Sequence, residues 1–406
     1  MTREAEADTG HPAPSHLFDT GPRTNRSPAL HSEGHFEFLN RVDSVFFGRL
    51  RALLEEWYDR FPADGQAHVR GRIRSENDRD ALSGFWELYL HEFLTRSALR
   101  VDYEPETEAH SKRTDFSVVN SEHFFLEAAA IGPSDEQVAQ ARRERRVYDA
   151  INELESPDFF LWVDAESGGA ANPPGRRLRA GLRAWLQGLN YQDIVRRGRE
   201  AELEDPPTWT WSHGGWAIRF RAITKENARG KPGVRPLGVL GPRAIWMDCH
   251  MRIRRVLASK RRKLDAPYVI AVLCDGFAVH GSEESVNEAL YGSFMLSFDT
   301  GTGQSGEHRG TDGFFSPQKN RSVSALLSCV GLNPFVSPTT LLQKVPSLWL
   351  NPWAAYPLTT QPPAAKCVVL DLEQGTLRVE HPVMSLPELF GLEPDWPGPE
   401  DLRPDS

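Results

Sequence analysis

The sequence lacks the features that would place the chain in a membrane or hold it together with disulfides. It contains no run of about eighteen consecutive apolar residues, the length that a transmembrane helix needs. Its N-terminus is charged and proline-rich without an apolar segment, so no secretory signal is expected. Only four cysteines occur among 406 residues, and none forms a C-x-x-C pair. These absences predict a cytoplasmic protein with reduced thiols, no membrane association and no structural zinc site.

The sequence also lacks an overall positive charge. Its formal net charge is −9, which argues against a protein that coats nucleic acid nonspecifically. The charge is unevenly distributed, however, because residues 225–265 contain twelve Lys or Arg and only three Asp or Glu. A concentrated basic stretch of this kind is able to bind phosphates. A solvated basic helix explains the same composition equally well.

The length allows two domains, or one domain with large additions, and no internal repeat is present. Composition and hydrophobic patterning divide the chain into five segments. These are a disordered tail at 1–35, a helical segment at 36–80, an α/β core at 81–200, an α/β extension with a basic helix at 201–392, and an acidic tail at 393–406.

A helical run at 85–94, FWELYLHEFL, contains the first acidic residues of interest. Its large apolar residues recur at the spacing of one helix face and predict a buried stripe. The stripe consists of Trp86, Tyr89, Leu90, Phe93 and Leu94. Glu87 falls at the border of this stripe, whereas Glu92 falls on the opposite side. We therefore predict that Glu87 reaches a site and that Glu92 is solvated.

Two strand-like runs follow, KRTDFSVV at 112–119 and HFFLEAAAI at 123–131. Side chains of a strand alternate between two faces, so Asp115 and Glu127 can point the same way from neighbouring strands. Ala129 shares the face of Glu127. If the two strands pair, three carboxylates, counting the one on the preceding helix, could converge on one cation.

A capping-box spacing at Ser134 and Gln137 predicts that a helix starts there, and the apolar run at 158–165 predicts a buried strand after it. The order over 81–165 is then helix, strand, strand, helix, strand. Further on, alternating residues predict a hairpin in which Arg219 and Arg221 share one face. These arginines could contact phosphates, although an ordinary solvent-facing strand explains them as well.

Residues 81–165 resemble the core of the PD-(D/E)xK, or restriction-endonuclease-like, superfamily. In that superfamily a helix carrying Glu precedes a strand with Asp and a strand with the (D/E)-x-K motif. Thr114 and Asp115 stand at the first motif position, Glu127 stands at the acidic position, and Ala129 stands where the lysine is expected. The wider layout is also similar to that of uncharacterised bacterial proteins of comparable length, which implies no activity.

The resemblance implies that the missing lysine would position the attacking water and stabilise developing charge, and alanine can do neither. A cation from elsewhere could substitute for it. The candidates are Lys112 and Arg113 beside Asp115, Arg142 and Arg145 on the next helix, and Lys260 and Lys263 in the basic stretch. Otherwise the fold has lost hydrolysis and kept binding.

The leading hypothesis is a restriction-endonuclease-like α/β fold, a mixed sheet flanked by helices, with an N-terminal helical segment and a C-terminal α/β extension. It would be a Mg²⁺- or Mn²⁺-dependent DNA endonuclease, with RNA as an alternative substrate and defence or DNA processing as a setting. The catalytic set would be Glu87, Asp115, Glu127 and Lys112, of which Asp115 and Glu127 bind the metal. The nucleic-acid contacts would be Arg113, Arg142, Arg219, Arg221, Lys260 and Lys263.

Two alternatives remain open at this point. One is a catalytically inactive protein of the same fold that binds nucleic acid or a protein partner, including a second copy of itself. The other is a globular protein with no nucleic-acid role. The position of a basic side chain relative to Asp115 and Glu127 discriminates between these possibilities.

Overall fold

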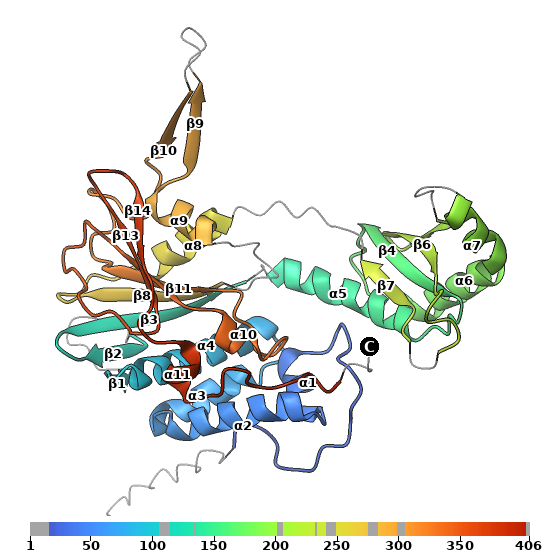
Figure 1. Ribbon diagram of the computed structural model, residues 1–406, viewed down its shortest axis with the longest axis horizontal. Coiled ribbons are helices and arrows are strands. Elements are labelled where there is room, and N and C mark those ends of the chain that lie inside the picture. The colour runs from blue at the N-terminus through green and yellow to red at the C-terminus, as the bar shows by residue number, and fades with distance from the viewer. Residues whose placement is uncertain are drawn as a thin grey trace, which may run out of the picture. The chain divides into compact units, whose positions relative to one another are not determined.

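The computed structural model describes residues 16–104, 114–132, 135–200, 206–231, 234–240, 249–274, 283–298 and 305–402. The chain divides into two compact units, and Figure 1 shows the elements of each. Unit 1 consists of residues 1–28, 34–132 and 247–406, and unit 2 consists of residues 29–33 and 133–246. Most of unit 2 is therefore an insertion into the chain of unit 1.

Helices form the N-terminal part of unit 1. Before the sheet, the described residues contain α1 (His35–Arg41), α2 (Val45–Arg60), α3 (Ala63–Ile73) and α4 (Asp78–Arg96). The start of α2 is capped from the far end of the chain, because the Asp401 carboxylate accepts hydrogen bonds from Ser44 Oγ at 2.5 Å and Val45 N at 2.9 Å. An acidic group at a helix N-terminus also interacts favourably with the helix dipole.

One mixed sheet forms the centre of unit 1. Eight strands of the described chain compose it, in the order β1-β2-β3-β8-β11-β12-β13-β14. Their bounds are β1 (Arg100–Tyr103), β2 (Phe116–Val119), β3 (His123–Ile131), β8 (Tyr268–Cys274), β11 (Ala325–Val330), β12 (Ser347–Leu350), β13 (Lys366–Leu370) and β14 (Leu377–Glu380). The strands from β1 to β3 pair antiparallel, whereas β8 lies parallel to both β3 and β11.

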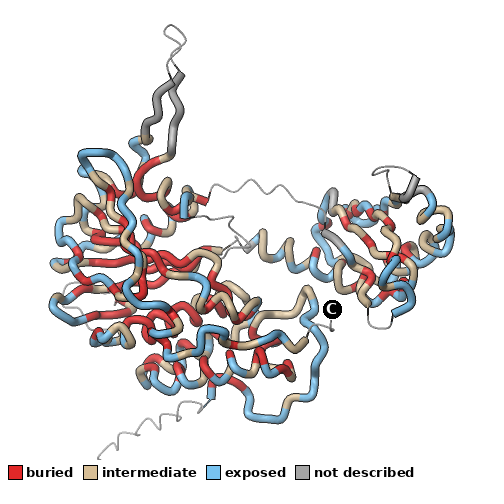
Figure 2. Tube along the Cα trace, viewed as in Figure 1, coloured by how far each residue is buried: buried red, intermediate tan, exposed pale blue. Residues whose placement is uncertain are grey.

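Helices cover both faces of this sheet, and alternation along β3 decides which side chains meet which helices. Phe124, Leu126 and Ala128 face the cluster built on α1 to α4, whereas Ala129 and Ile131 face the cluster built on α8 (Cys249–Lys260) and α9 (Glu283–Tyr291). The central strands are accordingly buried along their length (Figure 2). Unit 1 also contains a hairpin of β9 (Phe294–Phe298) and β10 (Ser305–Arg309), and the short helices α10 (Thr340–Gln343) and α11 (Leu386–Phe390).

Unit 2 has a smaller sheet of its own. The order β5-β6-β4-β7 joins β4 (Phe159–Ser167), β5 (Thr208–His213), β6 (Trp216–Thr224) and β7 (Leu237–Leu240). Three helices of the described chain belong to it, namely α5 (Asp135–Asn152), α6 (Gly175–Gln187) and α7 (Tyr191–Glu200). Apolar residues of α5 and α6 pack on one face of the sheet. The predicted hairpin carrying Arg219 and Arg221 is confirmed as β5 and β6.

The α/β class predicted from the sequence is confirmed, but the course of the chain differs from the expectation in two places. The strand at 158–165 does not join the sheet that contains β3, because it is β4 and pairs with β6 and β7. The place beside β3 is taken by β8, whose seven residues are all buried. In addition, Leu17 and Phe18 are buried although they fall in the segment expected to be disordered, because they pack in the helical cluster.

None of the helices in the described part of the chain combines the length and the apolar character that a membrane span requires.

Candidate active site

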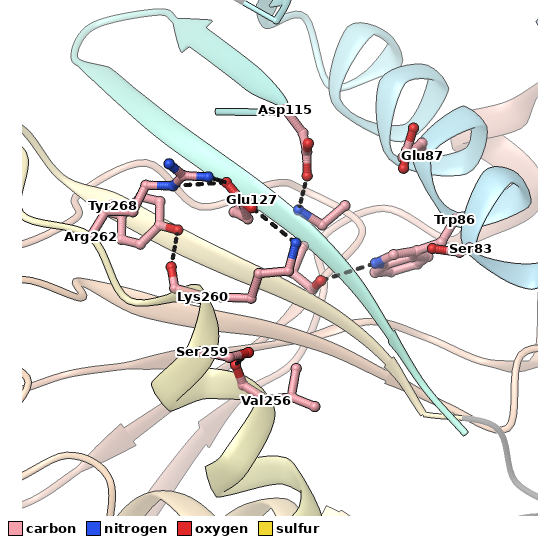
Figure 3. A network of polar contacts seen from close by, with 12 residues as sticks. Ser83, Trp86, Glu87, Asp115, Glu127, Val256, Ser259, Lys260, Arg262 and Tyr268 are labelled. Carbon is pink, nitrogen blue, oxygen red and sulfur yellow. Dashed lines mark hydrogen bonds and ion pairs between the residues drawn. The ribbon is translucent and has the colours of Figure 1, made fainter. Parts of the chain in front are cut away.

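Glu127 is the centre of a cluster of charged side chains on β3. Its side chain is 4 % exposed, and both carboxylate oxygens accept hydrogen bonds from cations. Lys260 Nζ lies 2.9 Å from Oε1, and Arg262 approaches Oε2 with Nη2 at 2.8 Å and Nε at 3.1 Å. Figure 3 shows these side chains grouped around the strand. A buried carboxylate is stable only with partners of this kind.

The position of Lys260 follows from the packing of α8. Ile253 and Leu257 of this helix are buried in the same cluster as Ala129, so the helix is fixed on the face of β3 that carries Glu127. Lys260 is the last residue of α8, and its carbonyl accepts a hydrogen bond from Tyr268 Oη at 2.7 Å. A lysine at position 129 would have to bury its ammonium among these apolar side chains. The amine instead comes from the end of the helix.

Asp115 lies directly before β2 and across from Glu127. The antiparallel pairing sets Phe116 against Leu126, so the next pair in that register is Asp115 with Glu127. Asp115 Oδ2 accepts a hydrogen bond from Ala128 N at 2.6 Å. Burial raises the pKa of Asp115 to about 6, and the negative charge of Glu127 adds to the rise. The two carboxylates therefore act on each other, as the sequence predicted.

Glu87 brings a third carboxylate to the cluster from α4. It is buried and forms an ion pair with Arg72 of α3, which also donates to Ser83 Oγ. Burial raises the pKa of Glu87 to about 7; Arg72 opposes this rise, while Asp115 adds to it and Lys260 opposes it more weakly. These electrostatic interactions connect Glu87 to the Asp115 and Lys260 side chains, and Figure 3 shows Glu87 on the neighbouring helix.

The prediction that Glu92 is solvated is wrong. Its side chain is 2 % exposed and forms ion pairs with Arg96 on the next turn and with Arg60 of α2, whose Nη2 lies 2.5 Å from Oε1. The helix α4 is buried on almost every side from Ala81 to Leu94, so a single apolar stripe does not describe it. The missing information was the position of Arg60, which comes from another helix.

The remaining predicted residues fall into three groups. Lys112 and Arg113 lie outside the described residues. Lys263 is exposed and lies three residues after the end of α8. Arg142 on α5 and Arg219 and Arg221 on β6 belong to unit 2 and not to the unit that holds Glu127.

Three members of the cluster were not predicted from the sequence. They are Arg72, Arg262 and Tyr268. Arg262 belongs to a run of four basic residues, Lys260 to Lys263, which signalled a phosphate-binding stretch but not which side chain turns inward. No comparable signal singled out Arg72 or Tyr268.

Among the described residues, the cluster does not form a complete set of metal ligands. Over the described residues, no group of three or more His, Cys, Asp or Glu side chains is placed to hold a metal ion. The donor chemistry of Asp115 and Glu127 is nevertheless the carboxylate oxygen that Mg²⁺ prefers. Burial raises the pKa of both Asp115 and Glu87, and repulsion from the neighbouring carboxylates adds to the rise.

Comparisons with known proteins identify no relative of this chain. No protein-family model, no curated protein and no solved structure shows significant similarity to it. The geometry of the cluster is therefore the basis for the functional conclusion.

Proposed function

We propose that this protein is a metal-dependent nuclease of the restriction-endonuclease-like type in which Lys260 takes the role of the motif lysine. The observation that carries the proposal is the contact of Lys260 Nζ with Glu127 Oε1 at 2.9 Å. The amine reaches the acidic motif residue from a different element than position 129, where the sequence has alanine. Asp115 lies across from Glu127 on the adjacent strand. DNA is the proposed substrate.

The order of elements around the cluster supports the same proposal. A helix with Glu87, a strand preceded by Asp115 and a strand with Glu127 follow one another along the chain. The next helix and strand of unit 1 are α8 and β8, and β8 lies parallel to β3. The insertion of unit 2 separates these two halves in sequence, and the order of elements that remains without residues 133–246 supports the proposal.

The roles of the residues follow from their charges and positions. Asp115 and Glu127 would hold a Mg²⁺ or Mn²⁺ ion, with Glu87 assisting directly or through water. When bound, the metal supplies polarisation of the phosphate and activation of water. Lys260 would then release one contact with Glu127 and place its ammonium beside the phosphate, where it stabilises developing negative charge. Arg262 would keep Glu127 oriented through its two contacts.

One observation favours a second candidate, a protein of this fold that binds nucleic acid without cleaving it. Both oxygens of Glu127 are engaged by cations, so the carboxylate is already charge-compensated. A cluster that never exchanges these contacts would be a structural ion-pair network. The Asp115 carboxylate weighs against this candidate, because it accepts a hydrogen bond from Ala128 N and has no ion pair among the described residues.

The test is cleavage of plasmid DNA and of single-stranded DNA and RNA by purified protein with Mg²⁺, with Mn²⁺ and with a chelator. We expect metal-dependent cleavage that the Glu127→Gln variant lacks. Glu37→Gln is the matched control, because Glu37 is an exposed glutamate of α1 in the same unit. Cleavage that survives Glu127→Gln would eliminate the site. Binding of the same substrates without cleavage under any metal would favour the second candidate.

A further inference from the structure

The sheet of unit 2 has one face that its own helices leave open. Along β6 the residues alternate, with Trp216, Ile218 and Phe220 buried against the helices and Arg219 exposed on the other face. On β5, Thr208, Thr210 and Ser212 are likewise exposed, whereas Trp211 is buried. Such alternation is typical of an antiparallel sheet with one solvated face.

A tryptophan lies on this open face. The other tryptophans of the sheet, Trp209, Trp211 and Trp216, pack on the helix-covered side. Trp162 of β4 points the opposite way, since its neighbours Leu161 and Val163 are buried in the helix-covered core. It is only half-buried. An indole on a solvated sheet face offers a ring surface on which a nucleic-acid base can stack.

Polar contacts hold this ring in a fixed orientation. Trp162 Nε1 donates to Asp164 Oδ1 at 2.9 Å, and the guanidinium of Arg221 lies 5.2 Å from the ring centroid. Arg221 in turn pairs with Asp164 at 3.1 Å. The pairing of β4 with β6 sets Trp162 beside Arg221 and Asp164 beside Arg219. An indole and two guanidinium groups therefore lie together on adjacent strands.

The charge of the inserted segment suits a polyanion better than the rest of the chain does. Residues 133–246 contain eighteen Lys or Arg and fifteen Asp or Glu, whereas the whole chain carries a net charge of −9. Thr208, Thr210 and Ser212 add hydroxyl groups that can hydrogen-bond to phosphate oxygens.

We propose that the open sheet face of unit 2, centred on Trp162, Arg219 and Arg221, binds single-stranded nucleic acid. A base stacks on Trp162 and its covering guanidinium, and Arg219 with the hydroxyls of β5 contacts the phosphates. Every base has a face that can stack in this way, so the surface has little sequence preference. This inference rests on the proposed function only for the choice of nucleic acid as the ligand. Unit 2 would bind an unpaired strand.

The experiment is fluorescence anisotropy of the full-length protein with labelled 20-nucleotide single-stranded DNA, single-stranded RNA and duplex DNA, at low salt with a chelator. We expect the single strands to bind more tightly than the duplex. Trp162→Ala should weaken binding of single strands by about tenfold or more, and Arg219→Ala should weaken it less. Trp162→Phe should recover most of the affinity, which a merely structural loss of the indole contacts would not allow.

The matched control is Arg196→Ala, which removes an exposed arginine of α7 in the same unit. Thermal unfolding checks that every variant folds. The inference is overturned if single strands do not bind at low salt, if the duplex binds as well as they do, or if Trp162→Ala and Arg196→Ala bind alike. Binding that depends on Trp162 without any cleavage would refute the proposed function and leave this surface standing. Metal-dependent cleavage together with binding that does not depend on Trp162 would support the proposed function and refute this binding surface.

Discussion

The two buried glutamates of α4, Glu87 and Glu92, have different electrostatic surroundings. Glu92 lies between two arginines, Arg60 and Arg96, and belongs to the packing of the helices. Glu87 pairs with Arg72, and burial raises its pKa to about 7, with Asp115 adding to the rise and Arg72 opposing it. Glu92 joins α4 to α2 through Arg60. Glu87 lies near a second carboxylate, Asp115, and has a raised pKa.

The same contrast separates Glu127 from Glu92, although each is held by two cations. The partners of Glu92 come from α2 and α4, and both also contact the exposed carboxylate of Glu56. Glu127 has Asp115 across from it, and Asp115 is held by a backbone amide and not, among the described residues, by an ion pair. The Glu127 cluster therefore contains a carboxylate without an ion pair among the described residues, and this carboxylate supports the proposed metal site.

The largest expected effect comes from Asp115→Asn. The amide keeps the shape of the side chain and can still accept from Ala128 N, but it removes the negative charge. Cleavage should fall by about 1,000-fold, in the range typical of lost catalytic groups, while the protein stays folded. Asp59→Asn, at an exposed aspartate of α2, is the control. If both variants cleave equally well, Asp115 has no place in the site.

A smaller effect, on stability and not on chemistry, is expected for Glu92→Gln. The change removes the buried carboxylate that Arg60 and Arg96 share and leaves them the exposed Glu56. Breaking a fully buried ion pair costs about 3–5 kcal/mol. Both arginines are partly exposed and regain water, so we expect a loss of roughly 1–3 kcal/mol. Chemical denaturation followed by circular dichroism measures this loss. A Glu92→Gln protein that is folded but does not cleave would contradict the assignment of Glu92 to helix packing and not to the site.

The smallest effect is a pH dependence that distinguishes Glu87. The unfolded chain loses this proton near the ordinary value of 4.5, whereas the folded protein keeps it until about pH 7. Between these values the folded state binds more protons, so the free energy of unfolding falls as the pH rises. Glu87→Gln removes this decrease in the free energy of unfolding. Relative to the wild type, the variant should therefore be more stable at pH 8 than at pH 4 by roughly 1–3 kcal/mol.

Melting curves of both proteins at pH 4 and pH 8 provide the measurement. The gap between them should be larger at pH 8. Glu37→Gln, at an exposed glutamate, should leave the pH dependence unchanged. A gap that is the same at both pH values would mean that Glu87 ionises in the folded protein as readily as it does in water.

The sequence predicted the parts of the site that are local and missed those that come from far along the chain. Strand alternation placed Asp115 opposite Glu127, and the helix stripe singled out Glu87, because each depends on neighbours in sequence. Lys260 lies 133 residues beyond Glu127 and was one of several candidates, but the predicted catalytic set contained Lys112 in its place. The error at Glu92 has the same origin, since Arg60 approaches from another helix.

The insertion of unit 2 explains the largest difference in the fold. The run at 158–165 has the apolar character of a core strand, and nothing in its composition tells which sheet it joins. Its partners β6 and β7 follow it in sequence, which favours a local sheet over β3. The partner of β3, β8, begins at Tyr268 and could be recognised only from the three-dimensional pairing.

The most direct test of the account compares Lys260→Ala with Lys263→Ala. Both changes remove one lysine from the same basic run, but only Lys260 contacts Glu127, while Lys263 is exposed. Metal-dependent cleavage of DNA should fall by about 100-fold or more in Lys260→Ala and stay close to the wild-type rate in Lys263→Ala. Equal rates for the two variants, with both proteins folded, would contradict the assignment of Lys260 as the replacement for the motif lysine.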